Sequence, residues 1–255
     1  KVCSVYINFA IQKCGVIIYY FLSDVHLGLR DKGTEAAKEK KLIELLEKLS
    51  QDASEIFILG DLFDYWFEYR KVIQKDFISV LYMIKKLTER NIKIHYIIGN
   101  HDFLHRNYFS EYLGVNLYNG DLEYLIGDKK FYLGHGDGLV KNYIGYLILK
   151  KILRNKFIQN LYSLIHPDLG IMIASRVSKK SRDYTSSKSY GEIDGVFEAA
   201  KQKIDSGFDF VLFGHTHKRA FHKYKNGTYI NLGTWLEIPC YGKYDGHEFQ
   251  IIDWE

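Results

Sequence analysis

Short runs of β-branched and aromatic residues recur along this 255-residue chain and predict buried strands. The runs cover residues 16–22, 56–59, 92–98, 130–133, 210–213, 228–231 and 248–251. Between the first three runs, apolar residues recur at helical spacing over 35–49 and 77–89. Strand and helix therefore alternate, which predicts βαβ units and an α/β fold. Beyond Gly114 the strands follow one another more closely, as in the hairpin that Asn226-Gly227 predicts.

Segment 141–190 interrupts this pattern and is typical of a helical insertion. Four apolar residues share one helical face, and three basic residues lie opposite: Ile148, Leu149, Ile152 and Leu153 against Lys150, Lys151 and Arg154. Beyond Asn155 the apolar positions move to the other side, which predicts either a break at Asn155 or a helix contacted on two sides. Pro167 predicts a second boundary.

We expect one domain over 15–255, with 141–190 inserted in it. The 47% of hydrophobic residues suffice for one large core. Residues 1–14 carry no pattern that we can interpret and are left as an unassigned leader. The apolar run 16–22 could mimic a signal sequence, but it leads directly into Asp24 and His26 of the candidate site. It is also far shorter than the ~20 residues that span a bilayer, so we assign it to a buried strand.

The net charge of +4 is unevenly distributed along the chain. Segment 141–190 has ten Lys or Arg against two Asp, a local net charge of +8. A charged run is often only a solvated surface, but apolar residues are interleaved with these charges. That favours an anionic partner: phosphate, nucleic acid or acidic lipid. The cysteines (Cys3, Cys14 and Cys240) form no closely spaced framework, which favours a reducing compartment.

Five short polar motifs each follow a predicted strand. They are Ser23-Asp24-Val25-His26, Gly60-Asp61-Leu62-Phe63-Asp64, Gly99-Asn100-His101-Asp102, Gly134-His135-Gly136-Asp137 and Gly214-His215-Thr216-His217. Each motif is therefore expected on a loop at the carboxyl end of a strand, the edge at which open α/β sheets bind ligands. One such motif is weak evidence, whereas five together are difficult to obtain by chance.

The imidazole, carboxylate and amide groups of these motifs suit Mn, Fe, Zn or Mg. No cysteine is among them, which argues against structural zinc. Asp24 and His26 lie two residues apart on an extended segment, so both can bind one ion. His215 and His217 have the same spacing and can serve one ion each, and the Asp61 carboxylate can bridge two.

The ordered motifs resemble the calcineurin-like metallophosphoesterases, from about Val16 to the end of the chain. The resemblance implies a four-layer α-β-β-α sandwich and two divalent metal ions, for which we expect Mn2+. It implies two ligand sets that share one carboxylate: Asp24, His26, Asp61 and His217, and Asp61, Asn100, His135 and His215. A water or hydroxide between the ions would be the nucleophile. His101 would protonate the leaving group or hold a phosphoryl oxygen, and Asp64 would orient His101.

Residues 21–28, 60–66 and 99–104, with 173–176 and 185–188 of the insertion, resemble the UDP-2,3-diacylglucosamine diphosphatases of lipid A synthesis. This narrower resemblance implies that the insertion is a lid that admits acyl chains. It assigns four residues to the substrate: Tyr146, Arg176, Ser181 and Lys188. It also implies cleavage of a nucleotide-sugar-lipid to UMP and 2,3-diacylglucosamine 1-phosphate. The enzyme would act in the cytoplasm, peripherally bound to the cytoplasmic face of the inner membrane.

Two positions depart from that narrower family: His101 and Ser178 stand where many members have arginine. The substrate therefore stays open between the nucleotide-sugar-lipid and another nucleotide, a phosphoprotein or a nucleic acid. The apolar face of the insertion favours the lipid, so nucleic acid is not an expected partner. A non-catalytic scaffold on the same fold is a third hypothesis, against which the complete ligand set argues. The oligomeric state is left open.

Overall fold

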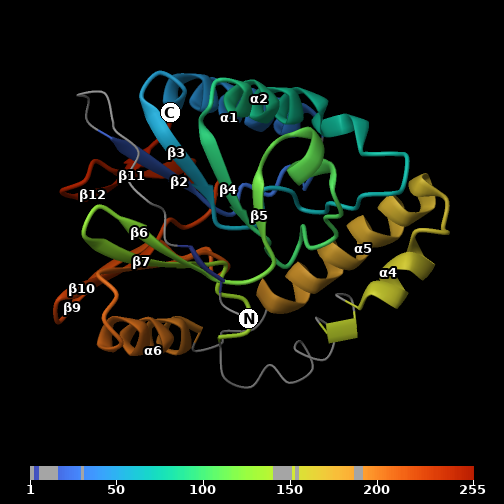
Figure 1. Cartoon of the computed structure of the whole chain (residues 1–255). Coiled ribbons are helices and arrows are strands. Elements are labelled where there is room, and N and C mark those ends of the chain that lie inside the picture. The colour runs from blue at the N-terminus through green and yellow to red at the C-terminus, as the bar shows by residue number, and fades with distance from the viewer. Residues whose placement is uncertain (1–2, 6–16, 30–31, 140–150, 153–154, 187–191) are drawn as a thin grey trace.

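The computed structural model describes residues 3–5, 17–29, 32–139, 151–152, 155–186 and 192–255. Two six-stranded sheets face each other in it (Figure 1). The β2 sheet has the order β12 (Phe249–Asp253), β11 (Cys240–Tyr244), β2 (Ile18–Leu22), β3 (Ala53–Ile58), β4 (Lys93–Ile97) and β5 (Asn116–Tyr118). The β7 sheet has the order β1 (Cys3–Val5), β6 (Leu122–Ile126), β7 (Lys129–Gly134), β8 (Phe210–Phe213), β10 (Gly227–Asn231) and β9 (Ala220–Tyr224).

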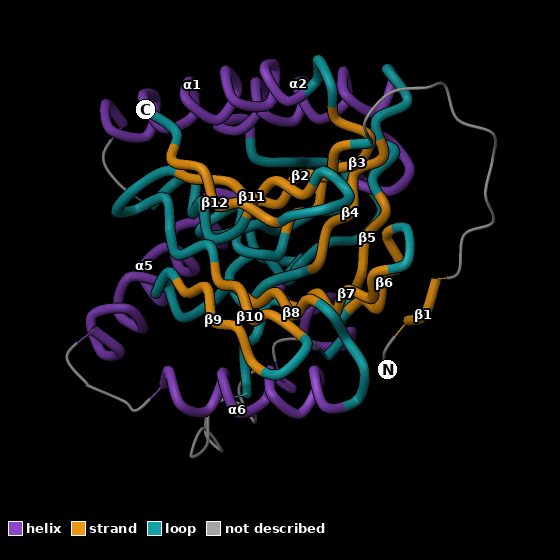
Figure 2. Tube along the Cα trace, turned by 90° about the vertical axis from the view of Figure 1, so that its left-hand side faces the viewer, coloured by secondary structure: helices purple, strands orange, loops and turns teal. Residues whose placement is uncertain are grey.

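Helices cover the outer faces of both sheets. Helices α1 (Lys32–Leu49) and α2 (Ile78–Glu89) lie over the β2 sheet, and α6 (Glu192–Asp205) lies over the β7 sheet (Figure 1, Figure 2). A 3-10 turn, Lys75–Phe77, precedes α2, and a π-helical turn, Tyr108–Tyr112, follows β4. This layering confirms the α/β class and the expected α-β-β-α sandwich.

Side-chain alternation along the central strands explains the layers. Successive residues of a strand face opposite sides of the sheet. In β2, Tyr20 and Leu22 pack toward α1 and α2, while Phe21 packs between the sheets. In β7, Leu133 packs between the sheets and Tyr132 packs toward α6. Strands buried on both faces consist of continuous apolar runs, and this is the pattern that predicted them.

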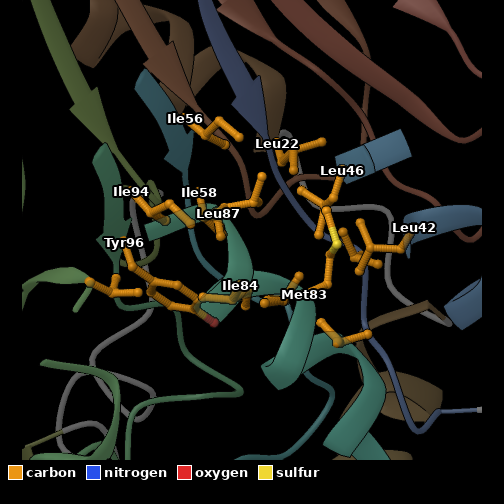
Figure 3. Packing of buried hydrophobic residues seen from close by; sticks show 14 of the residues in the cluster. Leu22, Leu42, Leu46, Ile56, Ile58, Met83, Ile84, Leu87, Ile94 and Tyr96 are labelled. Carbon is orange, nitrogen blue, oxygen red and sulfur yellow. The ribbon is translucent and has the colours of Figure 1, made fainter. Parts of the chain in front are cut away.

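Buried side chains fill each of the spaces between layers. One cluster joins Leu42 and Leu46 of α1 and Leu87 of α2 to the β2 sheet (Figure 3). Truncating a buried leucine of this kind to alanine costs about 2–5 kcal/mol. Between the sheets the packing is aromatic, with the rings of Phe21 and Phe57 stacked at a centroid distance of 5.0 Å.

The predicted strands, and the helices predicted over 35–49 and 77–89, are all present, as β2, β3, β4, β7, β8, β10, β12, α1 and α2. The predicted hairpin joins β9 and β10. The sequence pattern missed β1, β5, β6, β9, β11 and α6. Strand β9 illustrates the reason: it is an edge strand whose central residues are largely exposed, so it carries no apolar run. Strand β1 lies within the unassigned segment 1–14 and pairs in parallel with β6.

The insertion contains two described helices, α4 (Lys156–Tyr162) and α5 (Pro167–Ser186), which lie beside the sandwich (Figure 1). Asn155 caps α4: its side-chain oxygen accepts the backbone N–H groups of Phe157 at 2.9 Å and Ile158 at 3.4 Å. Of the two alternatives at Asn155, the structure shows a helix boundary, and α5 begins at Pro167, where the second boundary was predicted. Of the predicted apolar face, Ile148, Leu149 and Leu153 lie outside the described residues, and Ile152 is about half exposed. None of the described helices is long and apolar enough to cross a bilayer.

Candidate metal centre

The motif residues meet at the carboxyl ends of strands from both sheets. Asp24 and His26 follow β2, Asp61 and Asp64 follow β3, Asn100 and His101 follow β4, His135 follows β7, and His215 and His217 follow β8. Strands β2, β3 and β4 are parallel to one another, and so are β7 and β8. The site is therefore built where the carboxyl edges of the two facing sheets come together.

Asp24, His26 and His217 form the first group, in which one atom of each residue lies within 4.8 Å of the others. The Nε2 atoms of His26 and His217 are 2.9 Å apart. Asp24 Oδ1 lies 3.8 Å from His26 Nε2 and 3.5 Å from His217 Nε2. Two imidazole lone pairs at this separation face each other unfavourably unless a proton or a cation lies between them. A cation that also binds the Asp24 carboxylate fits this group.

Asp61, His135 and His215 form the second group, again within 4.8 Å of one another. Asp61 Oδ2 lies 3.2 Å from His135 Nε2. Asn100 joins the group, since its Oδ1 lies 2.9 Å from His135 Nε2 and 2.7 Å from His215 Nδ1. The other ring nitrogen of His135, Nδ1, lies 2.8 Å from the carbonyl oxygen of Leu59. That contact fixes Nε2 as the atom that faces the site.

Asp61 lies between the two groups. Its Oδ1 accepts the backbone N–H of His101 at 2.8 Å, and its Oδ2 also lies 3.8 Å from His26 Nε2. Oδ2 is buried, and its described polar neighbours are the ring nitrogens of His135 and His26. A buried carboxylate needs a positive charge beside it, which either a protonated His135 or a bound cation supplies. The residues present therefore fit divalent metal ions.

The loops that carry these ligands have an unusual backbone. Five candidate ligands have φ between 51° and 67°: Asp24, His26, Asp61, His215 and His217. Residues with side chains rarely adopt this region, and each case costs of order 1–3 kcal/mol. Hydrogen bonds between the loops hold the conformation, because Asp24 N donates to Gly60 O at 3.2 Å and His26 N donates to Asp61 O at 3.0 Å.

Two motif glycines are required by close approach. A Cβ at Gly60 would lie 2.6 Å from His135 Nδ1, and a Cβ at Gly99 would overlap Asp61 Oδ1. The loops after β3, β4 and β7 thus meet with no space for a methyl group. This explains why glycine precedes Asp61 and Asn100 in their motifs.

His101 and Asp64 lie at the side of the first group. His101 Nδ1 is 3.1 Å from the backbone oxygen of Asp64 and 3.6 Å from its Oδ1. Asp64 Oδ1 also lies 3.5 Å from His26 Nδ1. The Asp64 carboxylate therefore faces both imidazoles. The His101 side chain is 16% exposed, whereas that of His26 is completely buried, so of these two imidazoles His101 is the one that a substrate can reach.

The electrostatics of the site keep its carboxylates ionised. Burial alone would raise the pKa of Asp61, but His135 and His101 hold that pKa well below its usual range. Burial and the nearby His135 lower the pKa of His215 to about 4, so its ring is neutral. Burial would also lower the pKa of His135, but Asp61 and Asp24 outweigh it and raise the pKa to about 10. A metal ion at His135 therefore competes with a proton.

Other residues hold the ligand-bearing loops in place through hydrogen bonds. Asp102, the last residue of the third motif, accepts the backbone N–H groups of Leu62 and Gly99, both at 2.9 Å, and the hydroxyl of Tyr96. Sequence reasoning missed Glu35 and Lys38 of α1, which bond to the backbone of the loop after β2. A Glu-x-x-Lys pair is common on surface helices, so their sequence spacing gave no signal.

Of the four residues assigned to the substrate, two lie on a described helix. Arg176 lies on α5 and is exposed. Ser181 lies on the same helix, with a side chain that is not described. Tyr146 and Lys188 lie outside the described residues.

The helix pair α4–α5 is anchored to the loop that follows the candidate ligand Asp61. The rings of Phe67 and Tyr162 lie 5.0 Å apart, and the hydroxyls of Tyr65 and Tyr162 are 3.5 Å apart. Tyr162 donates its hydroxyl to the backbone oxygen of Gly170 at 2.6 Å, and a Cβ at Gly170 would overlap the hydroxyl of Tyr69. The aromatic residues after Asp64 therefore serve in packing and connect the insertion to the site.

Comparison with known proteins places the chain in a family. Calcineurin-like phosphoesterases match residues 19–219. A Porphyromonas gingivalis strain W83 protein named UDP-2,3-diacylglucosamine hydrolase is 29% identical over 245 residues, covering 89% of this chain and 94% of its own. A Haemophilus ducreyi strain 35000HP protein of that name is 31% identical over 227 residues, covering 86% and 92%. The structure of an archaeal phosphodiesterase covers 93% of this chain and 99% of its own, with 19% identity and a TM-score of 0.48.

The family match spans the loops after β2, β3, β4, β7 and β8, which supply the candidate ligands of these two groups and of a third, formed by His26, Asp61 and His101. Both the sequence match and the convergence of imidazoles on shared carboxylates indicate hydrolysis that depends on divalent metal ions. The chain belongs to the calcineurin-like phosphoesterase family and is a metal-dependent phosphoesterase.

Proposed function

We propose that this protein hydrolyses the pyrophosphate bond of UDP-2,3-diacylglucosamine to give UMP and 2,3-diacylglucosamine 1-phosphate, a step of lipid A synthesis. The observation that carries the proposal is an exposed apolar helix pair anchored directly beside a metal centre. Relatives named UDP-2,3-diacylglucosamine hydrolase, which align over most of this chain, support it.

The metal centre takes two ions in this proposal, with Mn2+ as the native ion because the ligands mix carboxylate, amide and imidazole. One ion is held by Asp24, His26, Asp61 and His217, and the other by Asp61, Asn100, His135 and His215. When bound, such ions lower the pKa of water and neutralise charge on phosphoryl oxygens.

His101 is the protein group that we assign to the reacting phosphate. Its Nδ1 faces Asp64, so Nε2 is the atom we direct to a substrate oxygen. The leaving group is a phosphate monoester, whose second pKa is about 6. It can therefore depart without complete protonation, and a hydrogen bond from His101 that strengthens as charge develops is sufficient.

The acyl chains are assigned to the helix pair α4–α5, which would act as the lid. Its exposed apolar residues include Phe157, Leu161, Leu164, Leu169, Met172 and Ile173. Phe157 and Leu164 are 73% and 80% exposed, and apolar patches of this kind mark lipid or protein contacts. Burial against acyl chains would contribute about 1.5–3 kcal/mol for each side chain that is fully covered.

The same helix pair is the surface that we assign to the cytoplasmic face of the inner membrane. Lys156 is exposed at the first residue of α4, Lys151 is exposed shortly before that helix, and Arg176 is exposed on α5. A Lys or Arg near an anionic leaflet contributes about 1 kcal/mol. The attachment would therefore be peripheral and would weaken as salt concentration rises.

Product analysis tests the proposal. The protein is incubated with Mn2+ and UDP-2,3-diacylglucosamine, and the products are identified by mass spectrometry. UMP with the lipid 1-phosphate is expected, whereas UDP would mean cleavage between sugar and phosphate. Bis-p-nitrophenyl phosphate serves as the control substrate: hydrolysis of that diester without any hydrolysis of the lipid would point to a different natural substrate.

A further inference from the structure

Two residues near the start of α1 bond to the loop that carries Asp24 and His26. Lys38 Nζ donates to the carbonyl oxygen of His26 at 2.6 Å. Glu35 Oε2 accepts the backbone N–H of Gly28 at 2.7 Å. The two side chains also pair with each other, with Lys38 Nζ 3.0 Å from Glu35 Oε1. Ammonium, carboxylate and loop backbone therefore form one connected network.

This ion pair differs from ordinary pairs on a helix surface. The Lys38 side chain is only 9% exposed, and lysine is almost never buried unless it is paired. On the same helix, Lys40 pairs with Glu44 at 3.7 Å, but the Lys40 side chain is 77% exposed. An exposed pair of that kind contributes little to stability. Lys40 is therefore a matched comparison for Lys38.

The network fixes the peptide groups on both sides of His26. The His26 N–H donates to the Asp61 carbonyl at 3.0 Å, and its own carbonyl accepts from Lys38. His26 and Gly28 both have a left-handed backbone, with φ of 51° and 92°. Without the Lys38 ammonium, the buried His26 carbonyl would lose this donor, and the strained backbone could relax toward a common conformation.

We infer that Lys38 and Glu35 are positioning residues, which hold the His26 imidazole in the orientation that binds metal. The inference rests on the metal centre of the proposed function. Neither residue touches the reacting atoms, so both act through His26. Loss of a partner that orients a metal ligand typically lowers metal affinity about 10–100-fold.

Calorimetric titration of the metal-free protein with Mn2+ tests the inference. Lys38→Met, which keeps the side-chain length, is expected to raise the Kd for Mn2+ about 10–100-fold. Raising the Mn2+ concentration should then restore kcat, with KM for bis-p-nitrophenyl phosphate unchanged. Lys40→Met should keep the wild-type Kd. Lys38→Arg, which retains the charge and a donor, should recover part of the lost affinity.

Thermal unfolding of each variant shows whether it is folded. A folded Lys38→Met variant with the wild-type Kd for Mn2+ would overturn the inference. If that variant does not fold, Glu35→Ala decides, because it removes the Gly28 contact and the partner of Lys38; an unchanged Kd would overturn the inference equally. Failure of the wild-type protein to bind Mn2+ would contradict the metal centre itself, which is a distinct result.

Discussion

His135 Nε2 lies 3.2 Å from Asp61 Oδ2, although the two residues follow strands of different sheets. Asp61 follows β3 of the β2 sheet, and His135 follows β7 of the β7 sheet. The contact therefore depends on how the two sheets face each other, and no single motif could form it. The candidate metal centre is a property of the whole sandwich.

Replacing His101 should separate catalysis from metal binding. His101 touches Asp64 and is partly exposed, and it is not among the ligands that we assign to either ion. A positioned acid or hydrogen-bond donor contributes roughly 10²–10⁴-fold in rate. His101→Ala should therefore lose most of kcat while its metal content, measured by elemental analysis, stays at the wild-type level. A fall in metal content parallel to the fall in rate would assign His101 to the ligands instead.

Glu68 should stabilise the fold in a pH-dependent way. Its Oε2 accepts the backbone N–H groups of Arg106, Asn107 and Tyr108, and the Trp66 indole donates to its Oε1. Burial alone would raise the pKa of Glu68, but His105 and these backbone groups hold it below its usual range. Since the unfolded pKa is about 4.3, the stabilisation is complete above that pH and is lost as pH falls through the lower folded pKa.

Glu68→Gln should therefore lower the free energy of unfolding by about 1–3 kcal/mol at neutral pH. The difference from wild type should shrink as the solution is acidified. Urea unfolding at several pH values measures both effects. Glu111→Gln is the control, because Glu111 is exposed and accepts only a side-chain N–H of Asn107 among its described hydrogen bonds. A constant difference at every pH would contradict the assignment.

The exposed apolar residues of α4 should matter for an acylated substrate. Phe157→Glu/Leu161→Glu places two charges on neighbouring turns of α4. Turnover of UDP-2,3-diacylglucosamine and binding to anionic vesicles should fall far more than turnover of bis-p-nitrophenyl phosphate. Ile78→Glu/Tyr82→Glu has the same spacing on exposed positions of α2. It should leave the turnover of both substrates and the binding to vesicles unchanged. Equal loss on both substrates would mean that the α4 face serves the fold rather than the lipid.

The contact between Tyr69 and Gly170 should control the docking of α5. A methyl group at Gly170 would overlap the Tyr69 hydroxyl, which has no hydrogen-bond partner among the described residues. Gly170→Ala should therefore lower stability and turnover of the acylated substrate. In a Tyr69→Phe background the same change should be stabilising, by up to about 1 kcal/mol, because alanine favours a helix over glycine. A double-mutant cycle measures this reversal of sign, and additive effects would contradict the contact.

The sequence predicted the parts of the fold whose burial leaves a periodic pattern. Strands β2, β3 and β8 are apolar runs because both faces are covered. The edge strand β9 has no such run, and β5 has only three residues, so neither gave a signal. The ligand types and their strand-end positions were also visible in the motifs.

Contacts between distant segments could not be predicted in the same way. The left-handed backbone of His26, the network of Glu35 and Lys38, and the anchoring of Tyr162 on Phe67 all depend on tertiary packing. None of these produces a local periodicity or a distinctive spacing. The packing role of the aromatic residues after Asp64 follows only from their contacts with the insertion, which the sequence does not show.

The metal content and turnover of Asp61→Ala test the central claim most directly. Asp61 Oδ2 lies near ligand candidates of both groups, at 3.2 Å from His135 Nε2 and 3.8 Å from His26 Nε2. Its removal should loosen both ions at once, whereas Asp245→Ala, in an exposed turn remote in sequence from every motif, should leave them in place. We predict that Asp61→Ala retains neither ion after dialysis and hydrolyses neither UDP-2,3-diacylglucosamine nor bis-p-nitrophenyl phosphate. Full activity of Asp61→Ala in chelator-treated buffer would contradict the two-metal account.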